Sequence, residues 1–304
     1  MAGYWGAMPP PDLVSVAKQA EALGYWGYFT AEAWGSDAFT PLAWIGAQTK
    51  STKLKDKVIL ITNIESDAGM HTAVFCAEQG ASLVLNCSNK TDPYLKSKIL
   101  SINNQVLFTN FDISVYENGE FLIKETIDKY KKLNSLINTP SFHIRKSLED
   151  IDAVEFYDSV RYGLKSTFVA TKFASKVMRK QEFGNITNMT SDAGLGVENS
   201  IGHSATSEGT IGMTRTVARD MAKYGVTCNA ICAGDFVSAS ILAASLCLDS
   251  MQSISGKTFG TKDGSIFIYQ EPRPIDTISK WGGFELEDLE SIMPQTIDKT
   301  LSDN

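Results

Sequence analysis

The sequence has few histidines, no long basic tract and no long apolar run. Only 3 histidines occur among its 304 residues, and the formal net charge is −7 with a pI near 5.1. A short lysine-containing stretch at 129–132 is typical of a solvated helix end. These features argue against nucleic acid or an anionic membrane surface as a partner, because both require clustered basic side chains.

The apolar stretches are too short for a membrane helix. None reaches the roughly 18 residues that a transmembrane helix needs, and the opening MAGYWGAMPPP lacks the basic and then apolar order of a secretory signal. We therefore expect no membrane association and a cytoplasmic location. The 5 cysteines are odd in number and have no histidine or cysteine partners at metal-ligand spacing, which favours buried free thiols over a zinc site.

The clearest structural pattern runs from Gly184 to Phe236. Residues 185–190 alternate weakly and are short enough to form a buried strand that breaks at Ser191. Residues that share a helix face, spaced by three and four, then continue from His203 to a glycine at 225. A second apolar run follows directly. Strand, helix and strand in this order predict a crossover unit of a parallel sheet, in which ligands bind at the carboxyl ends of the strands. Ser191 and His203 would both lie at that edge.

The preceding part of the chain shows the same alternation of short apolar runs and amphipathic stretches. Strands are expected at 58–62, 82–86, 106–112 and 135–138, and helices at 69–79, 120–133 and 156–178. The pattern predicts an α/β fold with a doubly wound parallel sheet.

These residues carry a family resemblance. The run TSDAGL, followed by GMTRTVARDMAKYGVTCNAI, resembles the catalytic half of the short-chain dehydrogenase/reductase superfamily and is most similar to its (3R)-hydroxyacyl-CoA dehydrogenase branch. The similarity extends over about residues 54–300. It implies a Rossmann-like sheet, NAD or NADP as cofactor, an acyl-CoA or a small carbonyl or alcohol compound as substrate, and a homo-oligomer.

The family mechanism uses a serine, a tyrosine, a lysine four residues later and an upstream asparagine or histidine. In this sequence Ser191 matches the serine, whereas His203, Ser207 and Gly163 stand at the other three positions. An unperturbed histidine titrates near about pH 6.5 and can transfer a proton. Ser207 cannot supply the positive charge of a lysine. The candidate catalytic residues are therefore Ser191 and His203.

The expected cofactor loop follows the first strand. The resemblance calls for three glycines there, but the chain has Asn63, Asp67 and Gly69. Glu65 and Asp67 would place two carboxylates near a pyrophosphate, at a cost of about 1 to 4 kcal/mol for each like-charge contact. The alternative is that Ser66 or Asp67 caps the following helix from within the chain.

The resemblance implies further cofactor contacts along the sheet edge. These candidate cofactor-binding residues are Thr62, Gly69, Asp112, Asn138, Gly234 and Ser238. Cys87 stands where a dinucleotide fold commonly has the acid that holds the adenosine ribose, so the sequence does not distinguish NAD from NADP. Pro140 removes a backbone donor from the loop after the fourth strand.

The two ends of the chain differ from this pattern. Residues 1–50 resemble the first part of luciferase-like flavin- or deazaflavin-dependent oxidoreductases, whose barrels typically need about 250 residues, so we expect an appended fragment. A linker is expected at 51–56, the dehydrogenase domain at 57–260 and a C-terminal extension at 261–304, with a hairpin turn at Asp263 and Gly264 and an acidic final helix.

Three functional hypotheses remain open at this point. The first is an oxidoreductase with the reduced site Ser191 and His203. The second is an inactive pseudoenzyme that binds a partner or dimerises through the helices at 156–178 and 203–223. The third is a non-functional chimera. The two other histidines, His71 and His143, are expected to be structural.

Overall fold

The computed structural model describes residues 53–88, 91–140, 144–274 and 276–302, together with Ser15 and Gln19 as single helical positions. The expected fragment at 1–50, apart from those two positions, and His143 lie outside the described residues. The chain divides into two units: the first ends at Ile268, and the second begins at Tyr269.

The first unit is built on one eight-stranded sheet. Its strands are β1 (Val58–Ile61), β2 (Ser82–Asn86), β3 (Val106–Thr109), β4 (Ser135–Asn138), β5 (Gly184–Thr190), β6 (Val226–Ala233), β7 (Thr258–Lys262) and β8 (Ser265–Ile268). Their order in the sheet is β3-β2-β1-β4-β5-β6-β7-β8, and all neighbours are parallel except the last pair. The expected α/β fold with a doubly wound sheet is confirmed.

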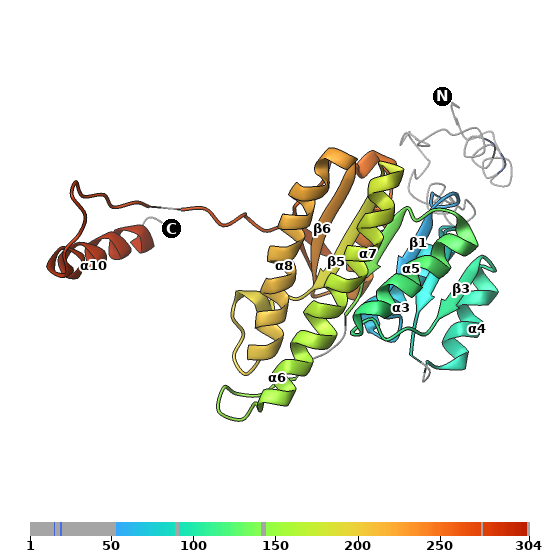
Figure 1. Cartoon of the computed structure of the whole chain (residues 1–304), viewed down its shortest axis with the longest axis horizontal. Helices are drawn as coiled ribbons and strands as arrows, with labels where there is room; N and C mark the ends of the chain where they lie inside the picture. Colours follow the sequence, from blue (N-terminus) through green and yellow to red (C-terminus); the bar gives the residue numbers. More distant parts are fainter. Residues whose placement is uncertain are drawn as a thin grey trace, which may run out of the picture. The chain divides into compact units, whose positions relative to one another are not determined.

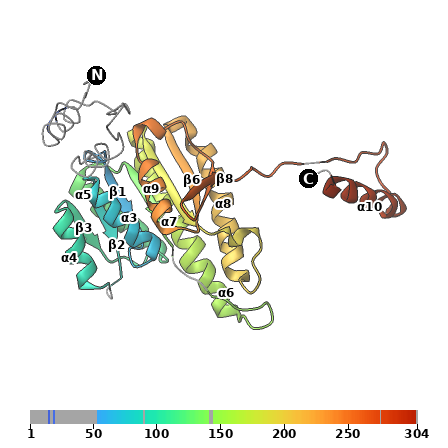
Figure 2. The same ribbon diagram turned by 180° about the vertical axis from the view of Figure 1, so that it is seen from behind.

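Helices cover both faces of the sheet. They are α3 (Asp67–Glu78), α4 (Pro93–Ile102), α5 (Tyr116–Tyr130), α6 (Ala153–Ser159), α7 (Ser166–Gln181), α8 (Ile201–Met221) and α9 (Phe236–Ser245). Helices α5, α7 and α8 lie on one face (Figure 1), and α3, α4 and α9 lie on the other (Figure 2).

Alternating side chains of the strands supply both cores. In β1, Ile59 and Ile61 pack toward α3 and α9, whereas Leu60 packs toward α5 and α7. All three are fully buried. A strand covered on both faces therefore needs a continuous apolar run, which is the pattern that identifies these strands in the sequence.

Two element boundaries differ from the expected ones for visible reasons. The strand expected at 106–112 ends at Thr109, because the side chain of Asn86 binds both the amide and the carbonyl of Phe111 and replaces the strand ladder there. The long helix starts earlier than expected, at Ala153, because Asp152 and Glu155 form a reciprocal capping box.

One residue of the expected linker belongs to the core, whereas residues 53, 55 and 56 are exposed. Leu54 is 2% exposed and packs among the residues of β1 and α3, and its amide donates to the carbonyl of Gln79 at 3.1 Å. At the other end, the sheet continues beyond residue 260 through β8. Asp263 and Gly264 both have positive φ angles of 49° and 77°, and they form the expected hairpin turn.

The second unit contains one helix, α10 (Leu286–Ser302), in its described residues. Acidic residues at 287 and 288 occupy its first turn, as expected for the acidic final helix. Asp288 pairs with Lys280 in the preceding segment and accepts a bond from the amide of Glu285. Among the described residues, no helix combines the length and the apolar character needed to cross a membrane.

Candidate functional site

Two adjoining cavities lie at the carboxyl ends of the central strands. The strand order reverses between β1 and β4, the position at which open α/β sheets bind ligands. The larger cavity has a volume of about 520 Å³ and the smaller about 230 Å³. Pro140, which follows β4, lines both of them.

The turn between β1 and α3 separates the two cavities and is held by buried hydrogen bonds. The hydroxyl of Ser66 accepts from the Gly69 amide at 2.9 Å and donates to the carbonyl of Asn63 at 2.9 Å. The hydroxyl of Thr139 donates to the same Asn63 carbonyl at 2.8 Å. Ser66 is therefore the N-cap of α3, as one of the two sequence alternatives predicted.

Gly69 is required by this turn. A Cβ atom at Gly69 would lie 1.9 Å from the carbonyl oxygen of Asn63, which is backbone and cannot rotate away. Asn63 itself does not adopt a left-handed conformation, because it is not among the described non-glycine residues that have a positive φ angle. Gly69 therefore allows close packing of α3 against the turn, which is the role of the third glycine in a dinucleotide fold.

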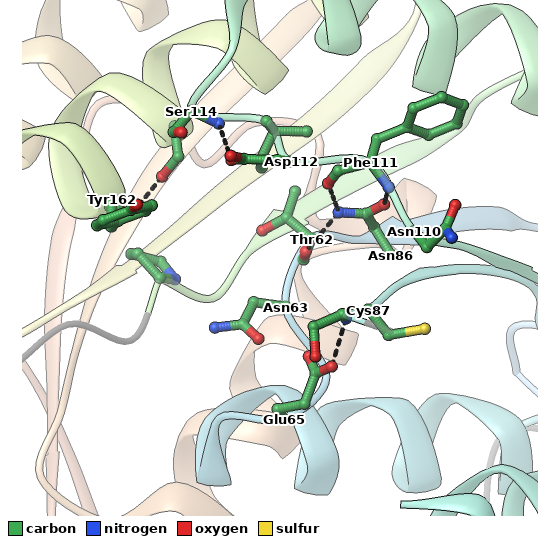
Figure 3. Close-up of a pocket in the computed structure, with 14 residues that line it drawn as sticks. Thr62, Asn63, Glu65, Asn86, Cys87, Asn110, Phe111, Asp112, Ser114 and Tyr162 are labelled. Atoms are coloured by element: carbon green, nitrogen blue, oxygen red, sulfur yellow. Dashed lines mark hydrogen bonds between the residues drawn. The ribbon is translucent and has the colours of Figure 1, made fainter. Parts of the chain in front are cut away.

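Asn86 organises the floor of the larger cavity. Its amide nitrogen donates to the carbonyls of Thr62 (3.2 Å) and Phe111 (2.9 Å), and its oxygen accepts from the Thr109 hydroxyl at 3.0 Å. Figure 3 shows this side chain between Thr62 and Phe111. It ties the ends of β1 and β3 together. The hydroxyl of Thr62 accepts from the amide of Thr139 at 3.2 Å, so Thr62 joins the ends of β1 and β4.

Asp112 lies on the rim of the larger cavity. Its Oδ1 accepts from the amide of Ser114 at 2.9 Å, and its Oδ2 is 3.9 Å from a guanidinium nitrogen of Arg161. The hydroxyl of Ser114 accepts from Nε of Arg161 at 3.1 Å. The carboxylate is thus oriented at the place expected for an adenine contact, but half of it is open to solvent.

The structure separates the two carboxylates that the sequence placed together. Glu65 lines the larger cavity, where its carboxylate accepts from the amide of Ser88 and the hydroxyl of Thr91. Figure 3 shows the side chain turned toward the end of β2, next to Cys87. Asp67 lines the smaller cavity at the first turn of α3. Only Asp67 therefore lies at the N-terminus of that helix.

The smaller cavity brings together all four positions of the expected catalytic motif. Gly163, Ser191, His203 and Ser207 line it from three different elements. Ser191 follows β5, its hydroxyl accepts from the amide of Ala193 at 3.1 Å, and it donates to Asp192 at 3.2 Å. His203, in the first turn of α8, is half-buried. The two candidate catalytic residues therefore share a cavity.

Gly163 sits in a π-helical turn, Val160–Lys165, between α6 and α7. A Cβ atom there would lie 2.3 Å from Cγ2 of Thr206, whose hydroxyl donates to the carbonyl of Ser159 at 3.2 Å. Thr206 fills the space next to the backbone of Gly163. An asparagine at position 163 would require Thr206 to move, so the missing side chain and the neighbouring threonine fit one another.

Four of the six candidate cofactor residues do not line either cavity: Gly69, described above, and three residues that lie farther along the sheet edge. Asn138 is fully buried, and its amide donates to Thr171 at 3.1 Å and to Asn188 at 2.8 Å. Ser238 donates to the carboxylate of Asp235 at 2.5 Å. A Cβ atom at Gly234 would lie 2.5 Å from the carbonyl oxygen of Thr261. These three residues support the sheet edge in this conformation, and a direct contact with a cofactor stays a prediction.

Some lining residues were not identified from the sequence. Tyr162 and Ser166 reach the larger cavity from the π-helical turn and from the start of α7. The π-helical turn shifts the residues around it by one position relative to a regular helix, and the sequence carries no signal of that shift beyond Gly163. The bond from Glu65 to the β2 end was missed because its partners lie 23 and 26 positions away.

The cysteines are all buried free thiols, as expected. Burial raises the pKa of Cys228 to about 12 and that of Cys247 to about 11. Burial also raises the pKa of Cys232, on the wall of β6, to about 12, and the nearby carboxylates of Asp192 and Glu208 add to the effect. The thiols of Cys228, Cys232 and Cys247 are therefore protonated at neutral pH. Among the described residues no cluster of side chains is suited to hold a metal ion.

Comparisons with known proteins identify a family and several relatives with a similar sequence. The sequence model of the family described as short chain dehydrogenase matches residues 57–244. A 3-oxoacyl-(acyl-carrier-protein) reductase of Synechocystis is 32% identical over 191 residues, which cover 60% of this chain and 75% of the relative. The dehydrogenase-containing peroxisomal hydratase-dehydrogenase-epimerase of Saccharomyces cerevisiae is 30% identical over 188 residues, 58% of this chain and 21% of that protein.

Solved structures agree with the fold. A short chain dehydrogenase from Mycobacterium avium superposes with a TM-score of 0.76 at 21% identity and covers 81% of this chain and 96% of its own. A xylitol dehydrogenase solved with bound NAD⁺ superposes with a TM-score of 0.65 at 19% identity, over 68% of this chain and 98% of its own.

A separate match concerns another family. Sixty residues are 50% identical to a protein of Mycobacterium tuberculosis named as a coenzyme F420-dependent oxidoreductase, and they cover 20% of this chain and 17% of that protein. The match is in line with the deazaflavin-dependent fragment expected at residues 1–50, and it is too short to include a complete barrel.

Proposed function

The chain belongs to the short-chain dehydrogenase family, and on that premise we propose that it is an NAD(P)-dependent oxidoreductase that interconverts an alcohol and a carbonyl group. The observation that carries the proposal is the meeting of all four catalytic-motif positions in one cavity beside a larger one at the switch point of the sheet. The relatives named as acyl-carrier-protein reductase and hydratase-dehydrogenase-epimerase favour an acyl thioester such as a 3-hydroxyacyl-CoA as substrate.

The residues of the larger cavity fit the adenosine half of a dinucleotide. The cavity extends from the turn after β1 to Asp112, which is oriented by the Ser114 amide, and it has room for a purine nucleoside. The pyrophosphate would lie at the N-terminus of α3, where the helix dipole favours an anion. Asp67 opposes it there, so we expect weaker dinucleotide binding than three glycines would give.

When bound, the nicotinamide ring supplies or accepts the hydride. The residues of the chain handle the proton and the substrate oxygen. The Ser191 hydroxyl, which now donates to Asp192, can rotate to donate to the substrate oxygen. His203, which lines the same cavity, would give a proton to that oxygen in reduction and remove it in oxidation.

Two positions limit the proposed chemistry. Ser207 is 1% exposed and uncharged. This position therefore supplies no positive charge to hold the ribose or to favour proton transfer by His203. Gly163 contributes no polar side chain to a proton relay. We therefore expect turnover to be slow, since a positioned acid or base typically contributes about 10² to 10⁴-fold.

The first experiment is a titration with NADH and with NADPH that follows nicotinamide fluorescence and the melting temperature together. We expect saturable binding and a rise in melting temperature. Turnover of a 3-hydroxyacyl-CoA chain-length series with NAD⁺ or NADP⁺ comes next. The chain between β6 and β7 is short, with α9 and one turn at Asp249–Met251, so we expect little selectivity for acyl length.

The activity is tested against matched variants. Ser191→Ala with His203→Ala should abolish turnover, whereas His71→Ala, an exposed histidine on α3, should not affect it. Absence of binding of either dinucleotide at millimolar concentration would reject the oxidoreductase and favour a scaffold. The proposed homo-oligomer is checked by light scattering, and the proposed cytoplasmic location by cell fractionation.

A further inference from the structure

The end of β2 lacks the group that normally holds the adenosine ribose. Dinucleotide folds commonly place an acid there, which accepts from the ribose hydroxyls. Here the position is Cys87, which is 5% exposed, and its thiol donates to the carbonyl of Thr109 on β3 at 3.2 Å. The thiol is therefore engaged in the sheet and cannot replace a carboxylate toward a ribose.

A carboxylate reaches the same place from another element. Glu65 leaves the turn between β1 and α3, and one of its oxygens accepts from the amide of Ser88 and from the hydroxyl of Thr91. Ser88 follows Cys87 directly after β2, and Thr91 lies three residues beyond Ser88. The side chain of Glu65 lines the larger cavity together with Asn86, Cys87 and Ser88 (Figure 3).

The hydrogen bonds fix the carboxylate where the missing acid would be. Thr91 is 6% exposed, and its single hydroxyl proton is within reach of two acceptors, the Glu65 carboxylate and the carbonyl of Ser88 at 2.8 Å, so the hydroxyl links Glu65 to this loop. A carboxylate accepts several hydrogen bonds at once. It can keep its bonds to the loop and still accept one from a ribose hydroxyl.

We propose that Glu65 determines the cofactor specificity of this chain: it accepts from the adenosine ribose of NAD(H) in place of an acid at position 87, and it excludes the 2′-phosphate of NADP(H). The inference rests on the proposed dinucleotide-binding function. The Ser88 amide, a natural donor to an added phosphate, is already occupied by the carboxylate of the chain. Among the described residues that line the cavity, none is a lysine or arginine.

The expected selectivity follows from like-charge repulsion. A 2′-phosphate carries nearly two negative charges, and each would lie within a few ångströms of the Glu65 carboxylate. At an exposed site each charge costs about tenfold in affinity, so NADPH should bind roughly 30- to 100-fold more weakly than NADH.

The test is the ratio of dissociation constants for NADH and NADPH in the full-length chain, measured by nicotinamide fluorescence. Glu65→Gln keeps an oxygen that accepts from Ser88 and Thr91 but removes the charge. We expect this variant to tighten NADPH binding about tenfold or more and to bring the two constants together. The melting temperature without ligand checks that the variant is folded.

Asp67→Asn is the matched control, because it removes one charge from the same turn but on the side of the smaller cavity. It should tighten NADH and NADPH by the same factor and leave their ratio unchanged. Lys90→Ala tests the basic residue that lies between Ser88 and Thr91 in the sequence. If the wild-type chain binds NADPH tightly and this variant does not, the 2′-phosphate is bound by Lys90 and the inference is overturned.

The outcomes separate the inference from the proposed function. Equal affinity of the wild-type chain for both dinucleotides, or an unchanged ratio in Glu65→Gln, overturns the role of Glu65 and leaves the oxidoreductase in place. Failure of both dinucleotides to bind at millimolar concentration overturns the proposed function and the inference together.

Discussion

The replacement Gly69→Ala should destabilise the chain, although alanine is the better helix former. The added Cβ would lie 1.9 Å from the carbonyl oxygen and 2.8 Å from the carbonyl carbon of Asn63, and 2.8 Å from Oγ of Ser66. The first two atoms are backbone, so the start of α3 must move away from the turn. That movement also breaks the 2.9 Å cap bond between the Gly69 amide and Ser66.

The magnitude combines three contributions. Overpacking of this kind costs about 1 to 3 kcal/mol, and loss of the cap costs about 1 kcal/mol. The helix preference of alanine over glycine returns about 1 kcal/mol. We expect a net loss of about 1 to 3 kcal/mol, measured as the free energy of unfolding in urea, and a decrease in melting temperature of roughly 2 to 12 °C.

The matched control is Gly212→Ala in α8, where no heavy atom lies within 4 Å of the added Cβ. This variant should be neutral or more stable by up to about 1 kcal/mol. A Gly69→Ala chain within about 0.5 kcal/mol of the wild type would refute the close approach of α3 to the turn.

Three further predictions follow from buried and capping groups. Burial raises the pKa of Cys228 to about 12, and all 5 cysteines are buried, so native protein at pH 8 should show no iodoacetamide adduct by intact mass, and denatured protein should show 5. The Ser238 hydroxyl holds the pKa of Asp235 below its ordinary range. The ionised Asp235 carboxylate therefore stabilises the fold above its unfolded-state pKa of about 3.9, and this stabilisation is lost as the pH falls through the lower folded-state pKa. Asp235→Asn should therefore reduce the fall in melting temperature on the acid side of a pH series. Equal acid profiles of the variant and the wild type would contradict this. Gly163→Ala should lower the free energy of unfolding by about 1 to 2 kcal/mol, because the added Cβ would lie 2.3 Å from Cγ2 of Thr206. Adding Thr206→Ser, which removes that Cγ2 atom, should restore most of the lost stability. Additive effects of the two substitutions would argue against a contact between positions 163 and 206.

The strands of the sheet could be predicted because their signals are local. A strand buried on both faces needs a continuous apolar run, and the run at 58–61 has no polar residue. Helix ends were less accurate: the capping box of Asp152 and Glu155 was readable in the sequence, yet the expected helix began later, at 156. The strand–helix–strand pattern placed Ser191 and His203 at one edge, and the structure brings both to one cavity.

The contacts of Glu65 could not be predicted, because they depend on the tertiary meeting of two loops. Position in the sequence suggested that Glu65 and Asp67 act together on the same helix end. The side chain of Glu65 instead finds two donors after β2, at Ser88 and Thr91, and only Asp67 stays at the helix. A turn residue with several donors within reach cannot be oriented from local propensity alone.

The departures from the family motif include two glycines of the cofactor turn, replaced by Asn63 and Asp67, and side chains that would reach a ligand. Where a neighbouring backbone atom excludes any Cβ, the glycine is kept, as at Gly69 beside Asn63 and at Gly234 beside Thr261. Where the family needs only a side chain that reaches a ligand, the residue has changed, as at Ser207. The first kind of position is enforced by folding, since a replacement costs stability in every molecule, whereas the second is enforced only by turnover. The preserved sheet edge therefore follows from the requirements of the fold, and catalysis in this chain depends on whether His203 and Ser191 suffice at an edge that folding alone maintains.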